Sequence, residues 1–105
     1  MPLPPQLTDE QRRDALRKAA LVRQARAELK QELKAGTLAL AELLERSAGD
    51  DTIGKIKVLA VLESLPGVGK VKARRTMEEI GISESRRVRG LGEQQRSALL
   101  KAFPS

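Results

Sequence analysis

The chain has 105 residues, of which 40% are hydrophobic, and it contains a single aromatic residue, Phe103. This length fits one compact domain with an extended arm, and the core has to be built from aliphatic side chains. The absence of cysteine and histidine excludes disulfides, thiolate metal sites and histidine-based catalysis. No apolar run could span a bilayer or serve as a signal peptide, so we expect a cytoplasmic protein that uses no metal or cofactor.

The charge of the chain is unevenly distributed. Twenty Lys and Arg residues oppose fourteen Asp and Glu residues, which gives a net charge of +6. Residues 1–36 hold eight bases and five acids, residues 37–65 hold three and five, and residues 66–105 hold nine and four. Two basic segments around a mildly acidic one indicate an anionic polymer as partner, although many small soluble domains are also basic.

The first predicted element is a long helix. Three prolines within residues 1–5 predict an extended start. Thr8 is a good N-cap, Gln11 stands at the capping-box position, and Gly36 is a typical C-terminal stop. The stretch between them lacks glycine and proline, so we expect one helix of about 27 residues and roughly 40 Å. Part of it should project from the core.

Two stripes run along this helix. An apolar stripe, expected to face the core, consists of Val22, Ala25, Leu29 and Leu33. A basic stripe consists of Arg12, Arg23, Arg26, Lys30 and Lys34. We interpret it as a second DNA surface, in addition to the turn and the arginine-rich connector described below. All of these bases except Arg12 lack an acid three or four residues away, and all except Arg26 fall within an arc of about 40°. The alternative is a solvated face whose acids come from other helices.

The remaining elements are also helical. Thr37 can cap a helix that runs to residue 46, and another is expected at about 57–64. A further helix covers about 70–80 and stops at Gly81, and Ser83 can cap a short helical turn. A last helix follows residues 90–92. No strand of useful length is evident, so we expect an all-α fold with a long N-terminal helix and a compact helix–two-turn–helix domain. The predicted division is 1–36 and 37–105, with the two-turn module at about 57–103.

The stretch L-P-G-V-G-K-V-K-A, residues 65–73, matches the pattern of a helix–hairpin–helix turn. Glycines permit positive φ, and the free N–H groups at the start of the next helix form an anion site. The predicted nucleic-acid contacts in this turn are Pro66, Gly67, Val68, Gly69, Lys70 and Lys72. Val68 should also pack the hairpin onto the core. The alternative is a turn without a ligand.

Arginines that follow the hairpin fall into two groups. Arg74 and Arg75 can pair with Glu78 and Glu79, so we expect them to be poor phosphate contacts. Three closely spaced arginines, Arg86, Arg87 and Arg89, stand on a short connector that ends at Gly90. Such arginines can straddle a phosphate backbone or enter a minor groove, where the negative potential is strong. The alternative is a solvated loop, with Glu84 and Glu93 as partial partners.

The run E-S-L-P-G-V-G-K-V-K-A and the later S-R-R-V-R-G-L-G follow a basic helix opened by L-T-D-E-Q-R. Together they resemble the actinobacterial integration host factors, which are unrelated to the β-armed enterobacterial protein of the same name. The resemblance implies a nucleoid-associated, non-enzymatic protein that binds duplex DNA with little sequence preference and changes DNA shape and topology. It implies contacts from residues 66–70 and from Arg86, Arg87 and Arg89. We expect a monomer that could touch two duplex segments.

Two alternatives remain. A small-subunit ribosomal protein carries the same two-turn module, so binding to structured RNA is the first alternative. Its long basic tail has no counterpart after Phe103, which disfavours this interpretation. Glycosylases of the formamidopyrimidine type also carry the module and use an N-terminal proline, as Pro2 would become. Their proline is followed by Glu, whereas Leu3 follows here, and their catalytic domain is missing.

Overall fold

Residues 8–104 are described by the computed structural model, and they form an all-α fold. The first element, α1 (Asp9–Ala35), is the predicted long helix. Its capping box is present, because Gln11 N donates to Thr8 Oγ1 at 3.1 Å and Thr8 N donates to Gln11 Oε1 at 2.9 Å. Gly36 ends the helix at φ 79°. The extended start that we predicted for residues 1–5 lies outside the described residues.

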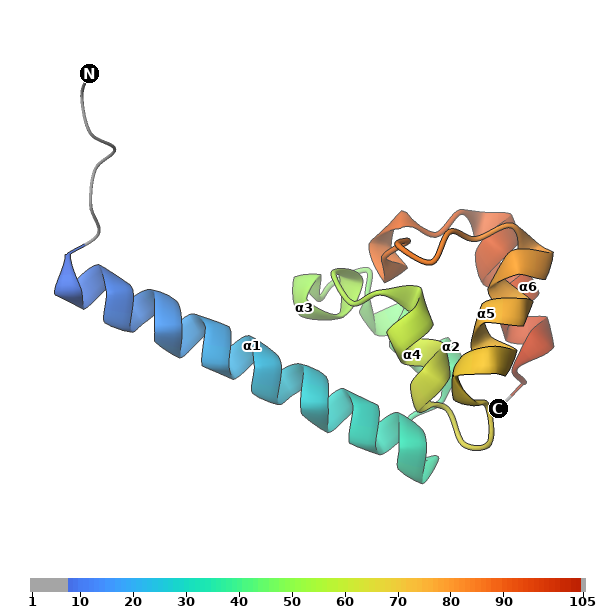
Figure 1. Cartoon of the computed structure of the whole chain (residues 1–105), viewed down its shortest axis with the longest axis horizontal. Helices are drawn as coiled ribbons and strands as arrows, with labels where there is room; N and C mark the ends of the chain where they lie inside the picture. The colour runs from blue at the N-terminus through green and yellow to red at the C-terminus, as the bar shows by residue number, and fades with distance from the viewer. Residues whose placement is uncertain (1–7, 105) are drawn as a thin grey trace, which may run out of the picture.

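The other elements pack beside the C-terminal half of α1, while its N-terminal half projects away from them (Figure 1). The described part of the chain has principal extents of 52 × 33 × 26 Å. None of its helices is both long enough and apolar enough to cross a membrane. The elements that follow α1 are α2 (Leu40–Arg46), α3 (Asp51–Gly54), α4 (Val58–Ser64), α5 (Gly69–Ile80), the 3₁₀-helix η1 (Val88–Gly90) and α6 (Glu93–Ala102).

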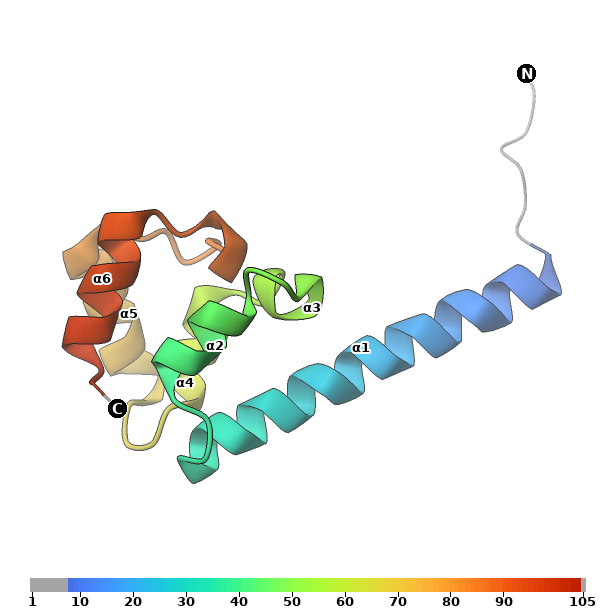
Figure 2. The same cartoon turned by 180° about the vertical axis from the view of Figure 1, so that it is seen from behind.

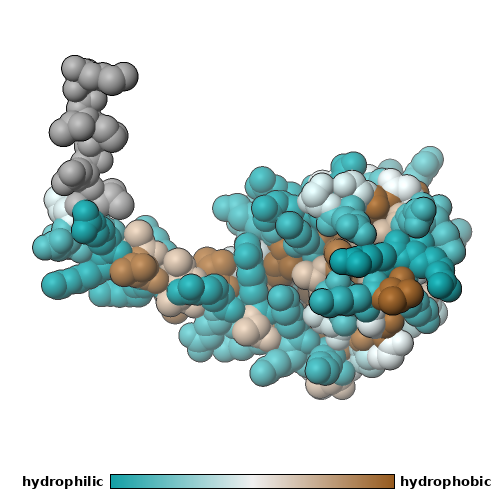
Figure 3. Space-filling view, viewed as in Figure 1, coloured by the Kyte–Doolittle hydropathy of each residue, from teal (hydrophilic) through white to brown (hydrophobic). Residues whose placement is uncertain are grey.

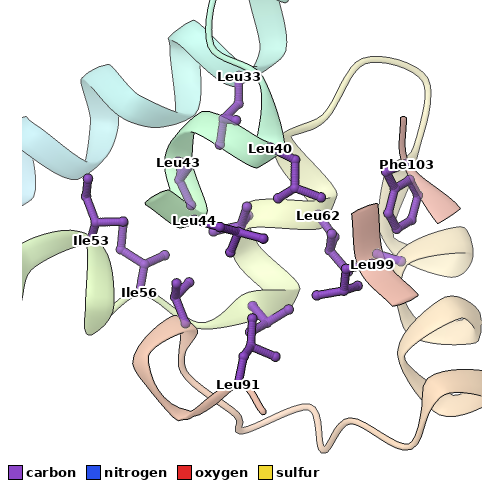
Figure 4. Close-up of a cluster of buried hydrophobic side chains, with 14 of the residues drawn as sticks. Leu33, Leu40, Leu43, Leu44, Ile53, Ile56, Leu62, Leu91, Leu99 and Phe103 are labelled. Atoms are coloured by element: carbon purple, nitrogen blue, oxygen red, sulfur yellow. The ribbon is translucent and has the colours of Figure 1, made fainter. Parts of the chain in front are cut away.

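A core of aliphatic side chains holds these helices together (Figure 4). Leu33 of α1, Leu43 of α2, Leu62 of α4 and Leu99 of α6 are all essentially inaccessible to solvent. Phe103, the one aromatic residue of the chain, closes the core beside α6. Each buried side chain of this size stabilises the fold by roughly 1.5–3 kcal/mol relative to exposure.

The apolar stripe of α1 reaches this core only at its C-terminal end. Leu33 is buried and Leu29 packs against the cluster, but Val22 and Ala25 are only half-buried. The prediction that the whole stripe belongs to the core was therefore wrong for its first half. The reason is that α3, the element nearest to this half, is a single turn and covers little of the helix.

Two helix starts differ from the prediction. Thr37 does not cap α2; its hydroxyl donates to the backbone oxygen of Glu32 at 3.2 Å and so helps to close α1. The helix that follows begins only at Leu40, on the side of the molecule seen in Figure 2. The second difference is α3, a separate helical turn for which no helix was predicted. Asp50 caps it, because its carboxylate accepts from Thr52 N at 2.9 Å.

Candidate nucleic-acid interface

The hairpin, residues 65–70, joins α4 to α5 through two glycines in the left-handed region. Gly67 has φ 74° and Gly69 has φ 69°, and a side chain is disfavoured at both positions. Pro66 is exposed, while Val68 between the glycines is half-buried and packs against the core as predicted. The hairpin is therefore a fixed turn whose tip faces solvent.

The first turn of α5 leaves its backbone donors open. In the part of the chain that the structure describes, no side chain caps this helix, so its first N–H groups point out beside the hairpin. Lys70 and Lys72 are exposed on the same turn. Ala73 and Met77 behind them are fully buried, which lets α4 and α5 approach closely. Backbone donors, helix dipole and two lysines together form a surface suited to phosphate.

Arg74 finds an acid, but not the one that we predicted. Its Nε lies 3.4 Å from Glu84 Oε1, so the partner comes from the chain after α5 rather than from Glu78. No ion pair joins Arg75 to Glu79 in the described part of the chain. Exposed pairs one helical turn apart contribute only a few tenths of a kcal/mol, so tertiary neighbours decide which of them form.

The connector, residues 83–92, is held by backbone hydrogen bonds to the segment between α3 and α4. Val58 N donates to Arg86 O and Val88 N donates to Ile56 O, each at 2.9 Å. These bonds form an isolated antiparallel bridge between Lys57 and Arg87. Val88 is buried and anchors the segment. The connector is therefore a rigid part of the fold rather than a free loop.

Ser83 plays a different role from the predicted helix cap. Its hydroxyl accepts from Ser85 N at 3.3 Å, and Arg86 N donates to Ser83 O at 3.0 Å, which makes a turn. The helical residues of the connector come later, as η1. The prediction of a helical turn starting at Ser83 was wrong, because the Val88 anchor and the bridge keep residues 86 and 87 extended.

The three connector arginines are all exposed and lack an acid within ion-pair distance in the described part of the chain. Arg86 Nη1 donates to Gly90 O at 2.9 Å, and Arg87 Nη1 donates to the backbone oxygen of Lys55. Glu84, the partner we considered for Arg87, lies beside Arg74 instead. The backbone contacts of Arg86 and Arg87 restrict where these two side chains point.

Two glycines give these arginines room. A Cβ on Gly54, at the end of α3, would lie 3.2 Å from the Cβ of Arg89. A Cβ on Gly90 would lie 3.1 Å from the Cδ of Arg86. The hairpin and the connector stand at opposite ends of α5 (Figure 1), a helix of about 18 Å at its usual rise. That span suits two contacts on one duplex.

The structure divides the basic stripe of α1 into parts with different surroundings. Arg12 is exposed on the projecting half. Lys30 and Lys34 line a hollow against α4 that also contains Glu63, so another helix does supply an acid there. Arg23 and Arg26 instead line a hollow against α3. Hydrophilic residues cover most of the face of the molecule that Figure 3 shows.

Sequence reasoning missed one base of this region, Lys55, which directly follows α3. Asp51 precedes it by four residues, so sorting bases by nearby acids would have treated the two as a neutral pair. No ion pair between them is formed in the described part of the chain. Only the tertiary structure brings Lys55 next to Arg87.

Residues 33–103 match the family described as the S13-like H2TH domain, and this class agrees with the two-turn architecture seen here. The chain is 56% identical to the integration host factor of Mycobacterium tuberculosis over 96% of both chains. It is also 56% identical to the Streptomyces coelicolor integration host factor, over 100% of this chain and 97% of that protein. The chain therefore belongs to the family of these integration host factors, as the sequence resemblance predicted.

A solved structure of sIHF bound to an 8-bp palindromic DNA is also similar. The TM-score is 0.81 and the sequences are 54% identical, and the match covers 83% of this chain and 98% of that one. This likeness agrees with the all-α fold and the long N-terminal helix.

Proposed function

We propose that this chain is a cytoplasmic, nucleoid-associated protein that binds duplex DNA with little sequence preference. By bending or constraining the duplex it would change DNA topology and compaction, and through them gene expression. The observation that carries the proposal is the connector. Its three exposed arginines have no acid partner among residues 8–104, and backbone hydrogen bonds hold it to the α3–α4 segment. Membership of the integration host factor family and the likeness to a DNA-bound sIHF support it.

The hairpin would hold phosphates of one strand. Its positive-φ glycines bring the backbone close to a ligand, and the uncapped start of α5 adds N–H donors. Lys70 and Lys72 add full charge. Arg86, Arg87 and Arg89 would then reach the same duplex at the other end of α5, where a narrow minor groove would favour them. Gly90 would leave room for the Arg86 side chain at this contact.

The basic stripe of α1 would form the second surface. If Arg12, Arg23, Arg26, Lys30 and Lys34 meet another duplex segment, a monomer could hold two segments together. Glu63 beside Lys30 and Lys34 weakens that part of the stripe. Sequence readout should be weak, because phosphate contacts carry no base information. With one aromatic residue in the chain, base stacking on the protein is disfavoured as a binding mode.

A competition between duplex DNA and duplex RNA of matched sequence tests this proposal against the ribosomal alternative. We expect the DNA to displace the RNA at lower concentration, and a clear preference for RNA would contradict the proposal. Names of the relatives favour the DNA interpretation, although the matched domain is described as S13-like.

We also propose that the chain is not an enzyme. Pro2, the residue on which a glycosylase reaction would depend, lies outside the described residues. Incubation with duplexes that contain damaged bases, with borohydride present to trap a covalent intermediate, should give neither strand cleavage nor a trapped adduct. Either product would overturn this part of the proposal.

A further inference from the structure

The hollow between α1 and α3 is strongly basic. Four cationic side chains line it, and Asp51 is its one acidic residue. The bases are Lys18, Arg23 and Arg26 of α1 and Lys55 after α3. We call these residues the α1–α3 groove. None of the four forms an ion pair within the described part of the chain.

The other flank of the same helix contact has the opposite charge. There Glu28 and Glu32 of α1 line a second hollow together with Asp50. Arg46 of α2 is the one basic residue among those that line it. These acids stand on a side of α1 that differs from that of Arg23 and Arg26. Arg46 is moreover held by Glu42 at 2.9 Å. A polyanion that approaches α3 is therefore attracted from one flank and repelled from the other.

Arg26 carries a donor that the protein itself does not use. Its Nε is shielded from solvent and has no hydrogen-bond partner among the described residues. A buried unpartnered donor is costly, so a rotation of the Arg26 side chain that brought Nε to an acceptor in the adjacent groove would be favourable. A phosphodiester suits this position, because the planar guanidinium can donate two parallel N–H groups to its oxygens.

The groove is continuous with the connector. The backbone oxygen of Lys55 accepts from Arg87, and Arg89 packs against Gly54, the residue before Lys55. A duplex that lies on Arg87 and Arg89 therefore has its phosphates next to Lys55. The other groove residues belong to α1, and α3 stands between α1 and the connector (Figure 1).

We propose that the α1–α3 groove is a phosphate-binding site for the duplex that lies on the connector, with Lys55 and Arg26 as its contacts. This inference rests on the proposed function. It assigns Arg23 and Arg26 to the first duplex and leaves Lys30 and Lys34 for a second segment. The bound path would be longer than the hairpin and connector alone can cover.

Site-directed cross-linking tests the position of the duplex. The chain has no cysteine, so Lys55→Cys introduces a single thiol, and Arg46→Cys introduces one on the acidic flank. Each variant is mixed with duplexes that carry a disulfide-activated tether on a backbone phosphate. Efficient disulfide formation at Lys55→Cys, with little at Arg46→Cys, is the expected result. Equal yields from the two variants would overturn the proposal.

Salt titration of binding tests the contribution of the groove. Lys55→Gln should weaken binding about five- to tenfold at low salt and reduce the salt slope by about 0.9, the effect of one lost phosphate contact. Arg46→Gln removes the same charge and should change neither quantity. Arg26→Lys keeps the charge but removes Nε, so affinity should fall while the slope stays unchanged. If Lys55→Gln or Arg26→Lys bound duplex DNA with the affinity of the wild type, the proposed phosphate site would be contradicted.

The same titration separates this inference from the proposed function. Should Arg89→Gln weaken binding while Lys55→Gln does not, the groove is wrong and the connector interface stands. Should neither variant weaken binding to duplex DNA, the proposed function itself fails. Far-ultraviolet circular dichroism and the melting temperature of each variant show whether the fold is kept, and both side chains of the compared pair, Lys55 and Arg46, are exposed.

Discussion

Arg87 Nη1 donates a hydrogen bond to the backbone oxygen of Lys55, 32 residues earlier in the chain. The contact joins the connector to the end of α3 beside the Lys57–Arg87 bridge. Arg87 thus has a structural role in addition to the DNA contact proposed for it. A charge that is exposed and also anchored costs less side-chain entropy when DNA binds.

Replacing Arg87 should show how much its hydrogen bond to Lys55 contributes to stability. Arg87→Ala removes the hydrogen bond to Lys55 O and should lower the free energy of unfolding by about 1 kcal/mol. The side chain of Arg89 forms no hydrogen bond within the described part of the chain, so Arg89→Ala should stay within about 0.5 kcal/mol of the wild type. Urea denaturation measures both. Equal stability of the two variants would show that the Arg87 contact is unimportant in solution.

Gly54 should be intolerant of even one methyl group. Gly54 is buried, and a Cβ there would lie 3.2 Å from Arg89 Cβ, so Gly54→Ala should displace the connector. We expect a loss of about 1–3 kcal/mol in unfolding free energy, as for overpacked sites, together with weaker DNA binding. Gly49→Ala is the matched control, because a Cβ there has no neighbour within 4 Å. Melting curves that coincide for both variants would contradict this packing.

The hairpin glycine Gly67 can be compared with Gly36 at the end of α1. Both have positive φ, 74° and 79°, and both have open space around a Cβ. Gly67→Ala and Gly36→Ala should therefore each lower the free energy of unfolding by about 1–2 kcal/mol, because of backbone strain. Only Gly67→Ala should also weaken DNA binding beyond what its stability loss explains. Similar affinities of the two variants, measured well below their melting temperatures, would remove the hairpin from the interface.

Local signals in the sequence predicted the ends of the elements well. Thr8 with Gln11, and the glycines Gly36 and Gly81, act at short range, so their helix ends follow from residues nearby. The hairpin was likewise recognisable, because its two glycines must stand on either side of Val68. Thr37 and Ser83 were the exceptions, because the Thr37 hydroxyl donates to Glu32 O within the turn that ends α1 and the Ser83 hydroxyl accepts from Ser85 N within a turn.

Long-range contacts escaped prediction. The Lys57–Arg87 bridge and the hydrogen bond from Arg87 to Lys55 join residues about 30 positions apart, and no periodic pattern marks them. For the same reason Arg74 was given the wrong acid, because Glu84 is brought to it by the chain reversal after Gly81. The arginines themselves were recognisable as candidate contacts, but their anchoring and the role of Lys55 were not.

A charge-reversed α1 tests the second DNA surface. Lys30→Glu combined with Lys34→Glu adds repulsion on the side shared with Glu63, so the variant should bind a short duplex nearly normally. It should change plasmid topology and compact DNA less than the wild type, because the contribution that comes from holding two segments together would be lost. The measurement is gel separation of topoisomers after relaxation with the protein bound. If the variant gave the same topoisomer distribution and the same compaction as the wild type, α1 would not be a second DNA surface.

The most direct test of the connector interface is a salt titration of duplex binding by two double variants with equal charge loss. Arg86→Ala with Arg89→Ala removes connector arginines, and Arg74→Ala with Arg75→Ala removes arginines of α5, one of them paired with Glu84. The connector variant should lose more than about tenfold in affinity, and its salt slope should fall by about 1.8. The α5 variant should change much less. Equal losses in affinity and slope for the two variants would contradict the connector as the DNA-binding site.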